Sequence, residues 1–218
     1  MTSTLARMDS FFPLFAIAGA LTLGAMSPGP SFVMVARTAV ARSRANGLAA
    51  ALGMGVGGAT YATASLLGLQ ALFAAVPVVY LLIKVGGGIY LIYIGVRIWG
   101  NSKQALLVSA DDGRSAPERP QRSFALALIT QLSNPKAAVV YGSIFAAFMP
   151  RYVPIAFGVS IPVVCFVIET GWYSTVASLL SSSRPRAAYL GFKSQFDRIA
   201  GSVMMLLGSK LIASAHEA

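Results

Sequence analysis

The sequence predicts an all-helical integral membrane protein with six transmembrane helices in two inverted three-helix repeats, whose first and fourth helices are broken. Three observations lead to this fold class. Of the 218 residues, 56% are hydrophobic and only 11% are charged, whereas a soluble domain has roughly 25% charged residues. Six apolar stretches are each long enough to cross a bilayer. Prolines interrupt two of these stretches at corresponding places in the two halves.

Each predicted span is a run of about 20 mostly apolar residues. The six runs lie near residues 11–36, 46–74, 77–99, 123–149, 153–181 and 197–214. Between the third and fourth runs, acidic residues and prolines indicate a solvated linker. We therefore divide the chain into a first three-helix repeat at 1–99, a linker at 100–122 and a second three-helix repeat at 123–218.

The first run resembles a signal sequence, because Arg7 precedes a long apolar segment. However, its apolar character continues past Pro30 to Ala36, which is longer than the core of a signal peptide. We expect this segment to be retained as the first span.

Basic residues alternate from loop to loop along the chain. The first, third and fifth connections hold most of the 17 Lys and Arg residues, and the net charge is +10. Because these basic residues are spread over several loops, we interpret them as setting the orientation in the membrane rather than as binding nucleic acid. Positively charged loops stay in the cytoplasm, so these loops, the 100–122 linker included, are predicted to be cytoplasmic. Both termini then lie on the opposite side of the membrane.

The two halves also resemble each other in sequence. Gly88 and Gly95 of the third span correspond to Gly201 and Gly208 of the sixth, and YATASLL at 61–67 corresponds to YSTVASLL at 173–180. Each half then has three spans. An odd number forces the second half to enter the membrane upside down, which gives the inverted repeat of many secondary transporters.

The first span is interrupted by Ser27, Pro28, Gly29, Pro30 and Ser31. Proline lacks the N–H that a helix needs and clashes with the preceding turn. In hydrocarbon, a freed backbone group is tolerated only where protein or a water-lined cavity satisfies it. We predict that these five residues bind substrate with the helix ends they create; a structural kink is the alternative.

The fourth span is interrupted at Asn134 and Pro135, directly before Lys136. A charge at the bilayer centre costs roughly 2.5–3.5 kcal/mol, so such a residue usually lines a cavity. We predict that Lys136 binds a substrate carboxylate, with Gln131, Asn134 and Pro135 beside it. The alternative is a lysine whose stem reaches to a membrane interface.

Glu169 is the acidic residue that we expect well inside a span. A lone membrane carboxylate is suited to carry a proton or to pair with an ammonium group, so we assign proton coupling to Glu169. The alternative is a structural salt bridge to Lys136 or Lys84. Tyr61 and Tyr173, which begin the repeated segments, complete the predicted binding set.

A stripe of glycines in the second span, with Gly53 and Gly57 four residues apart, has a spacing that lets helices pack closely. We interpret the stripe as a packing surface, either within one chain or between copies in a homo-oligomer.

Catalytic and metal-binding arrangements are missing from the sequence. Cys165 is the single cysteine, His216 is the single histidine and lies near the C-terminus, and no cluster of ligands offers a metal site. We therefore predict no cofactor, no metal and no enzyme activity. Two alternatives stay open: a membrane enzyme acting on lipid head groups with Lys136 and Glu169 as its acid–base pair, and a passive channel.

Several short motifs, taken in order, resemble the LysE/RhtB family of amino-acid exporters over nearly the whole chain. They are PGP at 28–30, RANGLAAALG at 44–53, KVG at 84–86, YLIYIGVR at 90–97 and NPKA at 134–137. The resemblance implies a bacterial inner-membrane exporter of amino acids or related small zwitterionic metabolites, driven by the proton gradient. The termini would then be periplasmic.

The chain departs from this family at one place. Many members carry an acidic residue shortly after the glycine stripe of the second span, where this chain has Gly57, Gly58, Ala59 and Thr60. By the internal repeat, Glu169 falls near that position in the other half. Either Glu169 has taken over the role of that carboxylate, or the implied proton coupling does not hold.

Overall fold

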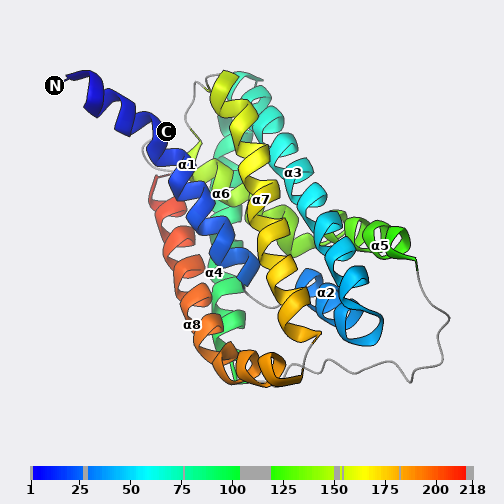
Figure 1. The fold of residues 1–218 in the computed structure, drawn as a ribbon. Helices are drawn as coiled ribbons and strands as arrows, with labels where there is room; N and C mark the ends of the chain where they lie inside the picture. The colour runs from blue at the N-terminus through cyan, green and yellow to red at the C-terminus, as the bar shows by residue number, and fades with distance from the viewer. Residues whose placement is uncertain are drawn as a thin grey trace.

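The fold, seen in a computed structural model, is a bundle of α-helices, and the part of the chain that the structure describes contains no strand. The described residues are 2–26, 29–75, 77–103, 119–149, 153, 155–181 and 183–214. Their helices are α1 (Thr2–Met26), α2 (Pro30–Ala41), α3 (Arg44–Ala75), α4 (Pro77–Gly100), α5 (Pro120–Leu132), α6 (Pro135–Phe148), α7 (Ile155–Leu180) and α8 (Ser183–Ala213). Figure 1 shows α4 beside α8 and α3 beside α7, with α2 and α5 against α3.

The break in the first predicted span separates α1 from α2, and the two helices meet at an angle of 57°. Gly29 is the N-cap of α2 and Pro30 is its first helical residue. Proline is well suited to this position, because the first N–H groups of a helix have no partner within it. Ser27 and Pro28, which we also predicted at this break, lie outside the described residues.

The break in the fourth predicted span separates α5 from α6. The side chain of Asn134 caps α6 by accepting a hydrogen bond from the backbone N–H of Lys136, at 3.0 Å, and Pro135 is the first helical residue. An N-cap side chain followed by proline starts a new helix, so this break follows directly from the local sequence.

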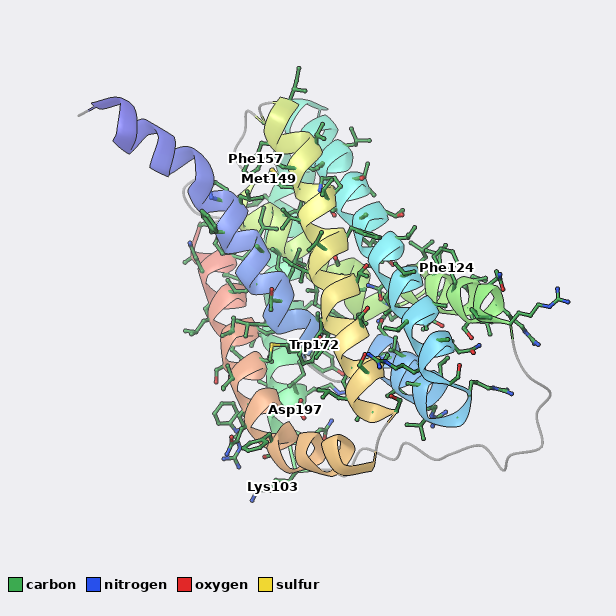
Figure 2. The ribbon with its side chains drawn as sticks, viewed as in Figure 1. Lys103, Phe124, Met149, Phe157, Trp172 and Asp197 are labelled. Atoms are coloured by element: carbon green, nitrogen blue, oxygen red, sulfur yellow. The ribbon has the colours of Figure 1, made fainter. Side chains whose placement is uncertain are left out.

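The glycine stripe of α3 is a packing surface, as predicted, and it serves helices of the same chain. A Cβ atom at Gly53 would collide with the backbone of Phe124 on α5, which Figure 2 shows beside α3. A Cβ at Gly55 would collide with the Thr170 side chain of α7. The missing side chains therefore let α3 approach both α5 and α7 closely.

The repeated glycines of α4 and α8 also face each other, in a crossed pattern. A Cβ at Gly88 would lie 2.8 Å from the carbonyl oxygen of Gly208, and one at Gly95 would lie 2.6 Å from that of Gly201. The two backbones are thus in direct contact at two levels.

The last helix is longer than the apolar run from which we predicted it. The predicted span begins at residue 197, whereas α8 begins at Ser183. Residues 183–196 contain three basic residues and several polar ones, so a hydropathy criterion stops where this polar segment begins. The helix itself continues, because a helix needs apolar residues to span a membrane and not to form.

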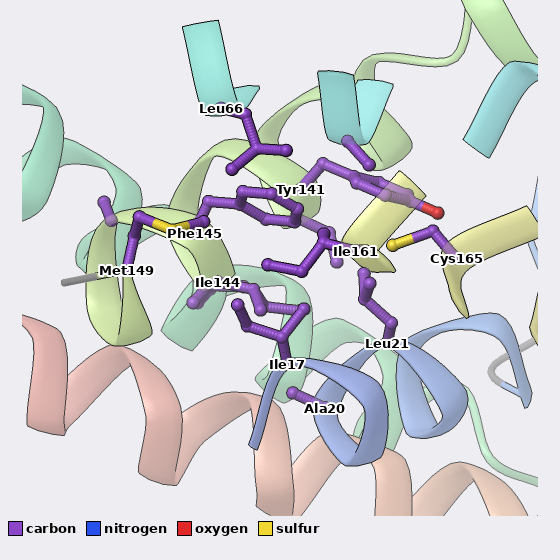
Figure 3. Packing of buried hydrophobic residues seen from close by; sticks show 14 of the residues in the cluster. Ile17, Ala20, Leu21, Leu66, Tyr141, Ile144, Phe145, Met149, Ile161 and Cys165 are labelled. Carbon is purple, nitrogen blue, oxygen red and sulfur yellow. The ribbon is translucent and has the colours of Figure 1, made fainter. Parts of the chain in front are cut away.

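Buried apolar side chains of α1, α6 and α7 form the larger part of the core. Figure 3 shows Ile17 and Leu21 of α1 facing Ile144 of α6 and Ile161 and Cys165 of α7. Cys165 is a free thiol buried in this cluster. A second cluster joins α2, α3 and α7.

Large apolar side chains also cover the outside of the bundle. Val159, Val163 and Val167 lie four residues apart on α7 and are each more than half exposed, which places an apolar stripe on its outer face. Phe157–Leu180 is long and apolar enough to cross a membrane as a single helix, and α1 with α2 meets the same criterion as one bent span. That the other predicted spans also cross the membrane, which would complete the six-helix arrangement, stays a prediction.

Candidate functional site

A pocket lies where the two helix breaks meet, between α1, α2, α5, α6 and α7. The space between its lining atoms is about 390 Å³, with the open space at its mouth included. Its lining combines apolar residues of α1 and α6 with polar and charged residues near the two breaks. The lining residues are Leu21, Gly24, Ala25, Gly29, Ser31, Gln131, Asn134, Lys136, Ala137, Val140, Tyr141, Glu169 and Tyr173.

The two breaks are joined by buried hydrogen bonds. The hydroxyl of Ser31 on α2 donates to Oε1 of Gln131, near the end of α5. The same hydroxyl accepts a bond from Nδ2 of Asn134, at 2.9 Å. All three side chains are buried, so these bonds are shielded from competition with water and fix α2 against α5 and α6.

Lys136 lies directly after the cap of α6 and is half-buried at the pocket. A Cβ atom at Gly29 would lie only 3.3 Å from Cδ of Lys136, so the lysine stem packs on the glycine of the first break. Lys136 interacts electrostatically with Asp197 and Glu169.

Glu169 is buried on α7 and faces the same pocket. The hydroxyl of Tyr141 donates to its Oε1 at 3.1 Å, and Oε2 has no hydrogen-bond partner within the described part of the chain. Gly58 of α3 makes room for both groups, because a Cβ there would lie 2.8 Å from Cγ of Glu169 and 2.7 Å from the Tyr141 hydroxyl. The carboxylate therefore lies beside the glycine stripe of the second predicted span.

Not all predicted site residues line the pocket. Gly29, Ser31, Gln131, Asn134, Lys136, Glu169 and Tyr173 do, whereas Pro30 and Pro135 shape it by starting α2 and α6. Tyr61 lies behind the pocket. Its ring stacks on Tyr141 with centroids 5.6 Å apart, and its hydroxyl donates to the carbonyl of Leu132 at 2.8 Å. It thus satisfies a carbonyl that the end of α5 leaves without a helical partner.

Sequence reasoning missed two polar groups next to this pocket. Tyr141 lies within an apolar run and has no local signal that distinguishes it from a packing aromatic. Asp197 is buried on α8 and interacts with Lys136, but it lies at the edge of the predicted sixth span. A helical continuation through 183–196 would have placed it inside the helix and drawn attention to it.

A helical bundle with an apolar outer face and two broken helices that meet at a polar pocket defines a membrane transporter. The chain belongs to the LysE type translocator family, whose model matches residues 22–215. A translocator moves a solute and carries out no chemical reaction on it, which sets aside the enzyme alternative. The protein is thus a membrane protein of this family.

Relatives match most of the chain. It is 34% identical to the threonine efflux protein of Escherichia coli K12 over 87% of this chain and 92% of that protein. It is 32% identical to the threonine efflux protein of Salmonella typhimurium LT2, over 92% and 97%. It is 30% identical to the leucine efflux protein of Salmonella choleraesuis, over 83% of each. No solved structure matches the chain.

Proposed function

We propose that the protein exports small neutral amino acids across the bacterial inner membrane, and that the pocket between the two helix breaks is the substrate site. The observation that carries this proposal is the meeting of Gly29 and Lys136, from breaks more than a hundred residues apart, at one polar pocket. Broken helices at corresponding places in two halves are the usual sign of a transport site.

The charges of the pocket suit a zwitterion. A substrate carboxylate would bind the Lys136 ammonium and the donors at the starts of α2 and α6, because helix N-termini favour negative charge. A substrate ammonium would bind Glu169, whose Oε2 has no hydrogen-bond partner among the described residues. Lys136 and Glu169 both line this pocket, so one substrate molecule would contact both charges there.

The apolar wall of the pocket supports a neutral and compact substrate side chain. Leu21, Gly24 and Ala25 of α1 face Ala137 and Val140 of α6 there. A charged side chain placed against this wall would leave an ion without a partner. The names of the relatives, threonine and leucine efflux proteins, agree with an exporter of neutral amino acids.

We also propose two inverted repeats of three spans each, with cytoplasmic basic loops and periplasmic termini. The crossed contacts support this arrangement, because Gly88 meets Gly208 while Gly95 meets Gly201. If Gly88 corresponds to Gly201 and Gly95 to Gly208, each of these contacts is the image of the other under a two-fold axis. Such an axis in the membrane plane relates inverted repeats.

Export would be driven by protons, with Glu169 as their carrier. Its carboxylate lies against Gly58, close to where many relatives are expected to carry an acid of their own. This position supports a carboxylate role that has moved from one half to the other.

The function is tested by purified protein reconstituted into liposomes loaded with single amino acids. We expect efflux of threonine and leucine that accelerates when a pH gradient is imposed, and far slower efflux of lysine and glutamate. Accumulation against a substrate gradient separates a coupled transporter from a passive channel, which only equilibrates its solute. If every amino acid leaves these liposomes only as fast as it leaves liposomes without protein, the proposal is excluded.

Glu169→Gln and Lys136→Met divide the two roles. Glu169→Gln, which resembles the protonated form, should abolish proton-driven efflux and keep exchange of substrate across the membrane. Lys136→Met should abolish both, because it removes the charge that binds the carboxylate. Both rates are measured at equal amounts of inserted protein.

A further inference from the structure

Tyr141 of α6 lines the pocket, and the proposed transport mechanism gives it no role. It is only 2% exposed. Its ring stacks on that of Tyr61 of α3, and its ring centroid lies 6.2 Å from that of Phe145, which follows one turn later on α6. Figure 3 shows Tyr141 among the buried side chains of the larger core cluster. A ring packed in this way has little freedom to move, so the core fixes the position of its hydroxyl.

The Tyr141 hydroxyl contacts one of the two oxygens of the Glu169 carboxylate. A tyrosine hydroxyl has a single hydrogen to donate, and it donates this hydrogen to Oε1 of Glu169 at 3.1 Å. The other oxygen, Oε2, has no hydrogen-bond partner among the described residues. Within the described part of the chain, the protein therefore holds one oxygen of this carboxylate and leaves the other without a donor.

The second oxygen of Glu169 calls for a donor from the pocket. Glu169 is buried, and a buried charged group with an unmade hydrogen bond is costly in free energy. The carboxylate lines the pocket, so the pocket is where such a donor would enter. A substrate ammonium offers both a positive charge and three N–H donors, which suits this oxygen.

Helix α6 carries two of the groups on which this arrangement depends. Lys136 lies in its first turn and Tyr141 lies further along the same helix. Gly58 of α3 leaves the space beside them, because a Cβ there would lie 2.7 Å from the Tyr141 hydroxyl and 2.8 Å from Cγ of Glu169. Helix α6 thus sets the position of the lysine directly and that of the carboxylate through the tyrosine hydroxyl.

We propose that Tyr141 is a positioning residue for substrate binding: it holds Glu169 by Oε1, so that Oε2 is presented to the substrate ammonium. This inference rests on the proposed amino-acid export. The competing explanation is a merely structural hydroxyl that satisfies a buried carboxylate. In that case its removal would lower the stability of the protein and leave its affinity for substrate unchanged.

Tyr141→Phe separates the two explanations, because it removes the hydroxyl and keeps the ring. The full chain is reconstituted into liposomes and threonine exchange is measured at equal amounts of folded protein. KM should rise roughly tenfold with little change in kcat, as expected when one hydrogen bond to a charged group is lost. Tyr93→Phe is the matched control. Tyr93 is an exposed residue of α4 whose hydroxyl pairs with Arg97, and its loss should leave both constants unchanged.

Tyr141→Phe/Glu169→Gln tests whether Tyr141 acts through the carboxylate. Glu169→Gln leaves no charge to position, so adding Tyr141→Phe to it should change KM by less than about twofold. The comparison also decides the question if Tyr141→Phe alone fails to fold, because the double variant leaves no buried charge without its donor.

Two results would overturn the inference while the proposed function stands. One is a wild-type KM in folded Tyr141→Phe, and the other is an equal rise in KM when Tyr141→Phe is added to Glu169→Gln. If the wild-type protein exchanges no amino acid, the proposed function fails, and the inference that rests on it fails with it.

Discussion

At the scale of single residues, the absence of a side chain at Gly58 is as important as the charges it adjoins. Glu169 and Tyr141 both occupy the volume where a Cβ of residue 58 would lie. This glycine thereby provides the space for the buried carboxylate and for the hydroxyl that donates to it.

We predict that Gly58→Ala displaces Glu169 and reduces proton-driven export at least tenfold, since a shift of about 1.4 kcal/mol in the site is enough for that loss. Efflux at matched abundance measures the effect. Gly68→Ala on the same helix is the control, because a Cβ there meets no other atom within 4 Å. Equal losses in both variants would point to the helix as a whole rather than to the carboxylate.

Site residues could be predicted from the sequence where a charged residue or a proline interrupts an apolar run. Lys136 and Glu169 were identified in this way, and the structure brings both to one pocket. Gly58 and Tyr141 could not be, because glycine and tyrosine are ordinary residues in such a run and acquire a role only through the helices that face them.

At the scale of helices, the breaks determine where backbone groups become available. The carbonyl of Leu132 and the first N–H groups of α2 and α6 lie outside regular helical pairing, and side chains such as Tyr61 and Asn134 satisfy some of them. The starts of α2 and α6 lie beside Lys136.

We predict that Pro28→Ala or Pro30→Ala leaves membrane abundance near normal and removes most export. Alanine restores a backbone N–H and favours helix by about 3 kcal/mol over proline, so α1 and α2 can join and withdraw their ends from the pocket. Abundance by immunoblot and efflux from loaded cells measure the two effects. If both variants export at the wild-type rate, the break is only a structural kink and does not form part of the substrate site.

A second prediction concerns the contact between α4 and α8. Gly95→Ala should lower Tm by several degrees, because its Cβ would lie 2.6 Å from a backbone oxygen of α8 and overpacking typically costs 1–3 kcal/mol. Gly86→Ala on the same helix meets nothing within 4 Å and should be neutral or stabilising, as expected for alanine in a helix. A Tm of Gly95→Ala equal to that of Gly86→Ala would contradict the close contact.

Helices were predictable to the extent that hydropathy and proline determine them. The starts of α4 at Pro77 and of α6 at Pro135 follow from these signals. The first part of α8 does not, because its residues are too polar to meet a membrane criterion. Helix pairing was only suggested by the repeated glycines, since sequence similarity between two segments does not say whether they touch.

At the scale of the whole molecule, the distribution of basic residues predicts orientation. Cysteines introduced at Ser3 and Ser214 should react with a membrane-impermeant thiol reagent in intact cells, and one at Ser115 should react only after permeabilisation. Cys165 is buried, so the background labelling should be low. Labelling of Ser115 from outside together with protection of Ser3 would reverse the proposed topology.

The direct backbone contact between α4 and α8 limits how the protein can move. The backbones of α4 and α8 touch where Gly88 meets Gly208 and where Gly95 meets Gly201, so we expect these two helices to move together as one rigid body. We then expect the change that opens the pocket to each side of the membrane to occur elsewhere, at the two proline breaks. Spin labels on α4 and α8 should keep a constant separation throughout the transport cycle, while labels on α2 and α8 should not.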